Sequence, residues 1–237
     1  MSVEGRVAMI TGGTGALGQA VTEAFVEAGA AVAVTVRAEP EASGDRASST
    51  ARDVAPLLVK ADVGIEAEVQ RAVQAVVDRF GRIDILLHLV GGYVGDLPVT
   101  QTPEATWDRM LGMNLKSAFF CCKHVVPVMQ QHRWGRIVTV SSRAAVKVFP
   151  GISAYAAAKA GLLAFVEVLA GEVRDEGITV NAVLPSVIDT PANRRAMPNV
   201  DPSPWVKPEE IARLMLFLCS EAGKDISGAA VPIYGRA

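Results

Sequence analysis

The chain has 237 residues, half of them hydrophobic and a fifth charged, and its formal net charge at pH 7 is −2. This composition indicates a folded chain with a substantial core rather than a disordered one. The small net charge gives no footprint for nucleic acid or an anionic membrane. No apolar run approaches the roughly 18 residues that span a bilayer. We therefore expect a small-molecule substrate, with no nucleic-acid or membrane partner.

The cysteines and the N-terminus indicate the compartment. Cys121, Cys122 and Cys219 form an odd set without metal-ligand spacing, which predicts reduced thiols and no metal site. The first residues lead directly into an apolar segment, so no secretory signal is expected. We expect a cytoplasmic protein.

Apolar runs alternate with amphipathic stretches along the whole chain. A strand at 6–12 leads through a glycine-rich turn into a helix at 17–29, and a second strand follows at 30–36. The later elements are, in order, a strand at 55–63, a helix at 65–81, a strand at 83–92, a long helix within 104–132, a strand at 135–142, a helix over 153–165, a strand at 177–185, a helix near 208–221 and a strand within 228–234. Continuously apolar strands spaced by helices are typical of a parallel sheet covered on both faces. The pattern predicts one α/β domain over residues 1–237, of the Rossmann-type, doubly wound, three-layer class.

Two segments depart from this alternation. Residues 38–54 are rich in Ser, Ala and Glu and make a poor helix where one is expected. Residues 189–207 hold four of the thirteen prolines and are predicted to form a long loop, which we expect to act as a lid over the substrate.

The turn between the first strand and the first helix has the pattern of a dinucleotide site. Gly13, Gly15 and Gly18 satisfy G-x-G-x-x-G in a strand–turn–helix setting. Glycine lets the backbone approach a pyrophosphate closely, and the helix directs unpaired N–H groups and its positive end at that anion. We predict that a dinucleotide binds here.

The end of the second strand bears on which dinucleotide binds. An acidic residue there would accept hydrogen bonds from the ribose of NAD, whereas an arginine would pair with the 2′-phosphate of NADP. The strand ends at Val36, which has no carboxylate, and Arg37 follows. Glu39 is a rival about 20 residues past the glycines, but it precedes Pro40 beyond the strand. NADP(H) is favoured and NAD(H) is possible.

With these residues in place, the chain resembles the short-chain dehydrogenase/reductase family along nearly its whole length. The markers occur in the expected order: TGGTGALG at 11–18, ADV at 61–63, Asn114 within MNLKSAFF, VSS at 140–142, YAAAK at 155–159 and VNAVLPSVIDT at 180–190. The chain departs from the family pattern at Ala16, at His88 to Gly91 and at Pro185-Ser186. The resemblance implies cofactor contacts from Gly12, Gly13, Thr14, Gly15, Ala16, Leu17, Gly18, Arg37, Ala61, Asp62, Val63, Val90, Gly91, Gly92, Tyr155, Lys159, Pro185, Val187, Ile188 and Thr190.

The same resemblance implies the proton chemistry. Tyr155 and Lys159 are four residues apart and lie on one face of a helix, and Ser142 precedes Tyr155 by thirteen residues. The resemblance implies that Tyr155 exchanges a proton with the substrate and that Ser142 hydrogen-bonds the substrate oxygen. Lys159 would lower the pKa of the phenol and bond the nicotinamide ribose, and Asn114 would hold a water behind Lys159. No catalytic role is expected for His88, His124 or His132; His88 is expected to be a hydrogen-bonded structural residue, and His124 has no evident carboxylate partner.

The substrate is less well defined by the sequence. Apolar or ring-shaped ligands are suggested by Tyr93, Phe149, Met197 and Trp205, and polar edges of a ligand by Arg143, Asn193 and Arg194. The stretch 189–205 is similar to that of dihydropteridine reductases, a branch of the same family.

Three functions remain open: an NADPH-dependent reductase or dehydrogenase of a ketone or alcohol, a reductase of a quinonoid dihydropterin, and a nucleotide-sensing binding protein on the same fold. The family usually pairs its two long helices between subunits, so the resemblance implies a homotetramer or a homodimer.

Overall fold

Seven parallel strands form one sheet in the computed structural model, which describes residues 1–37 and 55–236. The strand order is β3-β2-β1-β4-β5-β6-β7, and every neighbouring pair is parallel. The strands are β1 (Val7–Thr11), β2 (Ala31–Val36), β3 (Leu57–Lys60), β4 (Ile85–His88), β5 (Gly135–Val140), β6 (Ile178–Pro185) and β7 (Ala230–Ile233). The predicted parallel sheet is confirmed.

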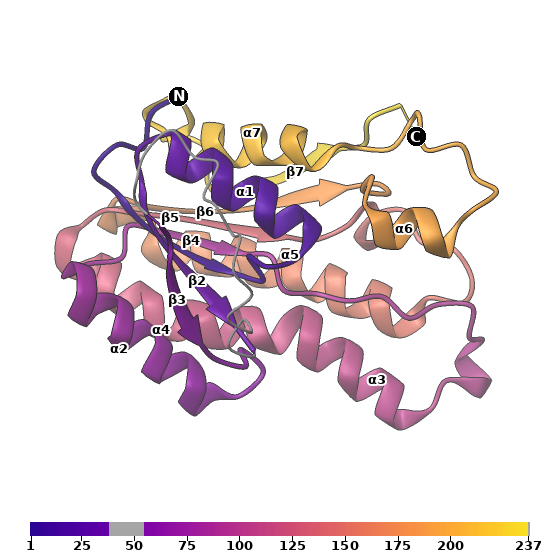
Figure 1. The fold of residues 1–237 in the computed structure, drawn as a ribbon. Helices are drawn as coiled ribbons and strands as arrows, with labels where there is room; N and C mark the ends of the chain where they lie inside the picture. Colours follow the sequence, from indigo (N-terminus) through magenta and orange to yellow (C-terminus); the bar gives the residue numbers. More distant parts are fainter. Residues whose placement is uncertain (38–54, 237) are drawn as a thin grey trace.

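Helices cover both faces of this sheet (Figure 1). One face carries α1 (Ala16–Glu27) and α7 (Pro208–Cys219), which pack against each other. The other face carries α2 (Glu66–Phe80), α4 (Ser117–His132) and α5 (Ser153–Val173). The fold is therefore the predicted doubly wound, three-layer α/β class.

The strands are apolar throughout because both of their faces are buried. In β1, Met9 belongs to the cluster under α2, α4 and α5, while its neighbours Ala8 and Ile10 belong to the cluster under α1 and α7. Successive side chains of a strand point to opposite faces, so a continuous apolar run fills two cores at once. The three cysteines are buried free thiols, as predicted.

Two predicted elements differ from the structure. The helix expected within 104–132 is divided into α3 (Glu104–Leu111), a π-helical turn (Gly112–Lys116) and α4. The lid, predicted as a loop throughout, contains the short helix α6 (Pro191–Ala196). Thr190 caps this helix by accepting the Asn193 N–H at 3.2 Å, and proline suits the first helical position. The irregular stretch 38–54 and the rival acid Glu39 lie outside the described residues.

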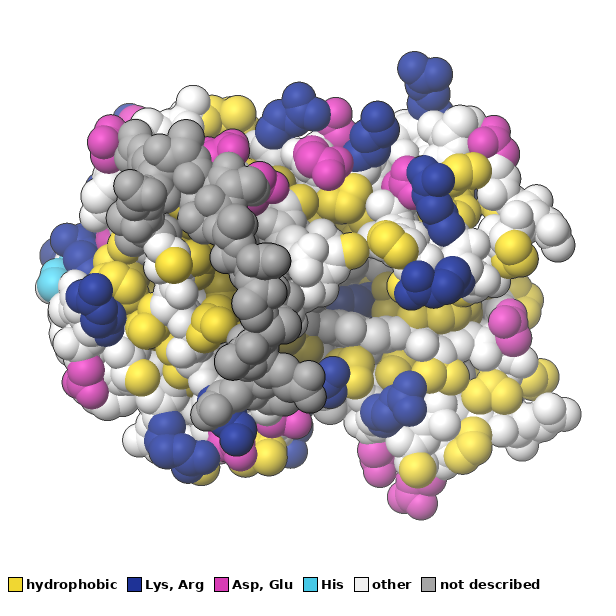
Figure 2. Space-filling view, viewed as in Figure 1, with side chains coloured by type: hydrophobic (Ala, Val, Ile, Leu, Met, Phe, Trp, Pro, Cys, Tyr) yellow, Lys and Arg dark blue, Asp and Glu magenta, His cyan; other side chains and the backbone are white. Residues whose placement is uncertain are grey.

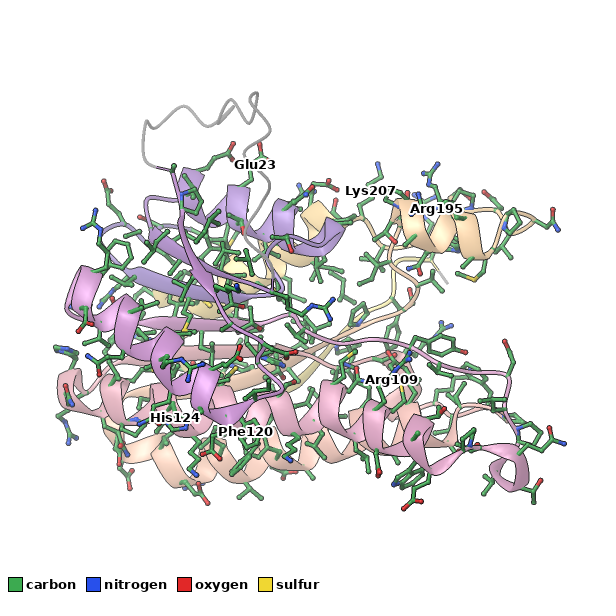
Figure 3. The ribbon with its side chains drawn as sticks, turned by 60° about the horizontal axis from the view of Figure 1, so that its bottom comes forward. Glu23, Arg109, Phe120, His124, Arg195 and Lys207 are labelled. Atoms are coloured by element: carbon green, nitrogen blue, oxygen red, sulfur yellow. The ribbon has the colours of Figure 1, made fainter. Side chains whose placement is uncertain are left out.

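The carboxyl ends of the strands meet at one edge of the sheet, which is on the right in Figure 1 beside α6. The chain leaves β1 toward β2 on one side and returns to β4 on the other, and such a switch point is where open α/β sheets bind ligands. Figure 2 shows the surface hollowed at this edge, with hydrophobic side chains inside the hollow. Figure 3 shows α6, which carries Arg195, on one side of the opening and α3, which carries Arg109, on the other.

Candidate active site

The turn after β1 is built for close backbone contact. Gly12 has φ +73°, a conformation that L side chains rarely adopt. A Cβ on Gly13 would lie 2.6 Å from Cγ1 of Val34, and a Cβ on Gly18 would lie 2.5 Å from Cα of Gly13. Because no side chain fits at these positions, the turn brings its backbone directly against the start of α1.

The N-terminus of α1 is suited to an anion. Its N-cap is Gly15, which supplies no side-chain acceptor, and its first turn contains no acidic residue. The N–H groups of that turn are therefore available to an external acceptor at the positive end of the helix. A cavity of about 530 Å³ begins here, between Ala16 and Gln19 of α1 and Pro191 and Lys207 across from them. A dinucleotide pyrophosphate fits this arrangement of donors.

The end of β2 presents Arg37. Val36 is buried, and its carbonyl accepts the N–H of Ala61 at 2.9 Å, so the 61–63 segment lies beside the end of this strand. Arg37 is exposed, whereas one carboxylate oxygen of Asp62 accepts the N–H of Gly64 at 2.8 Å. Arg37 forms no ion pair with another residue in the described parts of the chain, 1–37 and 55–236, and it lies at the carboxyl end of β2.

Tyr155 and Lys159 lie in α5 at the same edge of the sheet, one turn apart. Lys159 is 4% exposed, and its Nζ lies 6.0 Å from the centroid of the Tyr155 ring. Lys159 Nζ donates a hydrogen bond of 2.7 Å to the carbonyl of Val140 at the end of β5. Burial lowers the pKa of Lys159 to about 7. Its ammonium is thus held by a carbonyl and by no carboxylate of the described residues.

The pKa of Tyr155 differs from the sequence prediction. Burial raises the pKa of the phenol, and the hydrogen bond with Ser142 only partly opposes this. The expected lowering by Lys159 was wrong for this structure, because desolvation of the half-buried ring dominates. The phenol is therefore protonated at neutral pH.

Ser142 follows β5 and begins the short turn Arg143–Ala145, so its side chain faces the start of α5. Its Oγ accepts the N–H of Ala144 at 3.1 Å, which fixes the direction of the hydroxyl proton away from that N–H. The preceding residue, Ser141, donates from Oγ to the carbonyl of Lys159 at 3.0 Å. This contact ties β5 to α5 and was missed by the sequence analysis.

Asn114 lies in the π-helical turn and is fully buried. Its Nδ2 donates to the carbonyls of Gly92 and Met110, both at 3.0 Å, and its Oδ1 accepts the N–H of Gly92 at 3.1 Å. A Cβ on Gly91 would lie 2.8 Å from Asn114 Oδ1 and 3.1 Å from Lys159 Nζ, so these two groups converge on Gly91. The amide therefore fixes the 91–92 segment next to Lys159.

His88 lies at the end of β4 and is 1% exposed. Its Nδ1 is 3.0 Å from Thr11 Oγ1, and its Nε2 is 3.1 Å from Ser117 Oγ. The predicted hydrogen-bonded structural role is confirmed. Burial lowers the pKa of His88 to about 3. The carboxylate partner of His124, which was not evident in the sequence, is Glu66 from α2, 3.2 Å from its Nε2.

The residues predicted to contact substrate are divided between the opening and the protein interior. Tyr93 is 54% exposed and packs edge-on against Tyr155 with ring centroids 5.1 Å apart. Phe149 is also exposed, and the Arg143 guanidinium lies 5.7 Å from the Tyr234 ring centroid. Trp205 is buried. Tyr93, which contacts Tyr155, and Arg143, which follows Ser142 in the chain, are therefore the candidates placed next to these residues.

Polar side chains of the lid are occupied within the lid. Asn193 donates from Nδ2 to the carbonyl of Ile188 at 2.8 Å, and Arg194 binds both carboxylate oxygens of Asp189 at 2.6 and 2.8 Å. The prediction that Asn193 and Arg194 bind polar edges of a ligand stays a prediction; in this structure their local bonds hold α6 on its base. Met197 ends α6 and is half-buried.

The structure thus brings most of the predicted residues to one edge of the sheet. These residues follow the carboxyl ends of strands or lie in the helices that begin there. They are the turn at 12–18, Arg37, the segments 61–63, 90–92 and 185–190, Ser142, Tyr155 and Lys159. Among the described residues, no group of three or more His, Cys, Asp or Glu side chains is placed to hold a metal ion. No described helix has the length and hydrophobicity needed to cross a membrane.

Comparison with known proteins assigns this arrangement to a class. A family model described as "Enoyl-(Acyl carrier protein) reductase" matches residues 13–235. The 3-oxoacyl-[acyl-carrier-protein] reductase FabG of Thermotoga maritima is 33% identical over 99% of this chain and 98% of its own length. The (2S)-[(R)-hydroxy(phenyl)methyl]succinyl-CoA dehydrogenase subunit BbsD of Thauera aromatica is 34% identical over 99% of this chain and 97% of its own length.

Solved structures agree with these relatives. The crystal structure of levodione reductase superimposes with a TM-score of 0.90 at 30% identity, covering 98% of this chain and 97% of that one. The chain belongs to the short-chain dehydrogenase/reductase family. It is accordingly an NAD(P)-dependent oxidoreductase that acts on CH–OH or C=O groups.

Proposed function

We propose that this protein uses NADPH to interconvert a ketone and a secondary alcohol, with Tyr155 as the group that exchanges the proton. The observation that carries the proposal is the position of the phenol: it lies beside Ser142 and one turn from Lys159, and it is protonated at neutral pH. A neutral phenol is the form that can give a proton to a carbonyl oxygen.

The neighbouring residues have separate roles in this proposal. Ser142 donates its hydroxyl proton to the substrate oxygen and stabilises the charge that develops there. Lys159, now bonded to the Val140 carbonyl, would hold the ribose hydroxyls of a bound nicotinamide nucleotide, and its charge would stabilise the phenolate that forms when Tyr155 gives up its proton. Asn114 positions the 91–92 segment through three hydrogen bonds rather than touching the substrate. A bound nicotinamide would supply the hydride.

Preference for NADPH rests on Arg37. The side chain is exposed at the end of β2, and the preceding Val36 offers no carboxylate to a ribose hydroxyl. A guanidinium matches the geometry of a phosphate and stays charged at all working pH values. These features support a contact with the 2′-phosphate. The remaining cofactor contacts in the proposal are those of the 12–18 turn and of the segments 61–63, 90–92 and 185–190.

The opening favours substrates that have a large apolar part. Tyr93, Val148 and Phe149 are all more than half exposed, and the Tyr93 ring packs against that of Tyr155. Exposed apolar side chains of this kind can form a ligand surface. We take residues 189–207 as the lid over this substrate. The names of the two curated relatives refer to acyl-carrier-protein and CoA substrates, so a 3-oxoacyl thioester is the first ketone to test.

We further propose that the protein assembles as a homotetramer or homodimer through α4 and α5. Phe119 on α4 is 42% exposed and Val168 on α5 is 61% exposed, although both helices bury their other sides against the sheet. The ring of Phe119 lies 6.2 Å from that of Phe165, which makes one continuous apolar surface across the two helices. A second subunit would cover this surface.

The deciding experiment follows NADPH absorbance with 3-oxoacyl thioesters, simple ketones and quinonoid dihydropterin, for the natural chain and for Tyr155→Phe. Turnover of a ketone or oxoacyl substrate, lost by more than about 100-fold in Tyr155→Phe with cofactor binding retained, would support the proposal. Turnover confined to the dihydropterin would assign the protein to pterin reduction instead. Activity of Tyr155→Phe within severalfold of the natural chain would refute the role of the phenol.

A further inference from the structure

A second cavity, of about 350 Å³, lies at the opposite edge of the sheet from the candidate active site. It opens at the amino-terminal ends of β5 and β6 and is bounded by the end of α4 and by the segment after α7. Arg136 lines it and lies six residues before Ser142 in the chain, so the two ends of β5 are roughly 20 Å apart. Nothing in the proposed reaction uses this cavity.

Two buried polar groups line the cavity without hydrogen-bond partners. Arg136 is 4% exposed and Thr179 is 7% exposed, and the two residues are directly paired in the register of β5 and β6. Arg136 Nε and Thr179 Oγ1 find no partner among residues 1–37 and 55–236, although Arg136 Nη1 donates to the carbonyls of Gly135 and Gly177. Buried donors are rarely left unpaired, because each one lowers the stability of the folded state. An acceptor that reaches both groups would remove this free-energy cost.

The Arg136 guanidinium is also held in place. It lies 4.4 Å from the centroid of the Trp134 ring, and Arg6 lies 3.7 Å from the same centroid. Stacking on an aromatic ring stabilises a guanidinium through the quadrupole of the ring. The unpaired Nε is therefore presented by a fixed group, and a ligand that binds it would not have to order the side chain first.

The charges around the cavity favour an anion. Arg133, Arg174 and Lys224 add three cations to Arg136, and the carboxylates among the lining residues are Glu221 and Asp225. Lys224 holds Glu221 in an ion pair of 2.9 Å, whereas Arg174 forms no ion pair with any described residue. Positive charge in excess over a concave surface concentrates anions there.

We propose that this cavity binds a phosphate or carboxylate group, with Arg136 Nε and Thr179 Oγ1 donating to its oxygens and Arg174 supplying charge. The site is separate from the dinucleotide turn, which connects the carboxyl end of β1 to the start of α1. A bound anion would lie at the amino-terminal ends of β5 and β6. The carboxyl end of β5 leads to Ser142, and the carboxyl end of β6 leads to the lid. The inference is independent of the proposed reaction.

The test is isothermal titration of the full chain with inorganic phosphate and, separately, with sodium acetate, at constant ionic strength in chloride. Variants are Thr179→Val, which removes only the unpaired hydroxyl, and Arg174→Gln, which removes an exposed charge. Arg71→Gln on α2 is the matched control, because Arg71 is 70% exposed and lies outside the cavity. Each cavity variant is expected to weaken binding by about fivefold or more, and the control to leave it unchanged.

Stability measurements keep the result interpretable. Without phosphate, Thr179→Val is expected to be as stable as the natural chain, because the hydroxyl it removes has no hydrogen-bond partner among the described residues. With phosphate, chains with an intact cavity should gain more thermal stability than the two cavity variants. Stronger binding of phosphate or of acetate would identify the source of the anion. Binding that survives both cavity variants would locate the anion at the dinucleotide turn and overturn the proposal, as would the absence of binding by either anion.

Discussion

Substitution of His88 by asparagine should make the protein markedly less sensitive to acid. Ser117 Oγ donates its only proton to the Met113 carbonyl at 2.7 Å, so it must accept from His88 Nε2. His88 Nδ1 therefore accepts the hydroxyl proton of Thr11 and has no room for a proton of its own. A neutral ring is the form that this hydrogen-bond chain requires.

The magnitude follows from the pKa. Burial, aided by the charge of Lys159, lowers the pKa of His88 from 6.5 to about 3, whereas the unfolded chain titrates near 6.5. Between these values the unfolded state binds more protons than the folded state, so stability falls as the pH falls below about 6.5. The loss attributable to His88 is about 2 kcal/mol at pH 5 and approaches about 5 kcal/mol below pH 3.

The assay is urea unfolding of the chain without cofactor at pH 7, 6 and 5, at a single protein concentration because subunit assembly would also contribute. Between pH 7 and 5, the free energy of unfolding of the natural chain should fall by about 2 kcal/mol more than that of His88→Asn. His132→Asn is the control, since His132 is exposed at the end of α4. Equal pH dependence in the natural chain and His88→Asn would show that the ring is not held neutral.

Arg37→Asp is expected to shift the ratio of kcat/KM for NADPH and NADH toward NADH by about tenfold or more, and an unchanged ratio would remove Arg37 from the cofactor site. Gly91→Ala should lower turnover by about tenfold or more, because the added Cβ would lie 2.8 Å from Asn114 Oδ1; Gly112→Ala, whose Cβ meets nothing within 4 Å, is the control. Equal turnover in these two variants would contradict the proposed crowding. Phe119→Glu should dissociate the assembly, as measured by light scattering after size exclusion, and an unaltered mass would exclude α4 from the interface.

The fold could be predicted because each strand, turn and helix has a recognisable pattern in its own residues. The strands are apolar on both faces, and Gly13, Gly15 and Gly18 keep the spacing of a dinucleotide turn directly after the first strand. The spacing of Tyr155 and Lys159 likewise gave their common face on α5 without reference to the rest of the chain. Such features depend on near neighbours in sequence.

Other features of the site depend on contacts between distant residues. The partner of His88 Nε2 comes from 29 positions away, and the pKa of Tyr155 depends on how far tertiary packing removes water from the ring. The pair formed by Arg194 and Asp189 depends on α6, a helix that the sequence analysis did not predict in this proline-rich segment. Packing and solvent exclusion, rather than local propensity, decided these cases.

The π-helical turn at 112–116 affects both the position of Asn114 beside Lys159 and the orientation of the side chains on α4. A π turn accommodates one residue more than an α turn, and one residue rotates everything that follows by about 100° around the axis. Removing that residue would turn Cys121 and Val125 away from the sheet and carry Phe119 off the outer surface of α4. The hydrogen bonds that fasten Asn114 beside Lys159 therefore also set the angle at which the next subunit would meet this one.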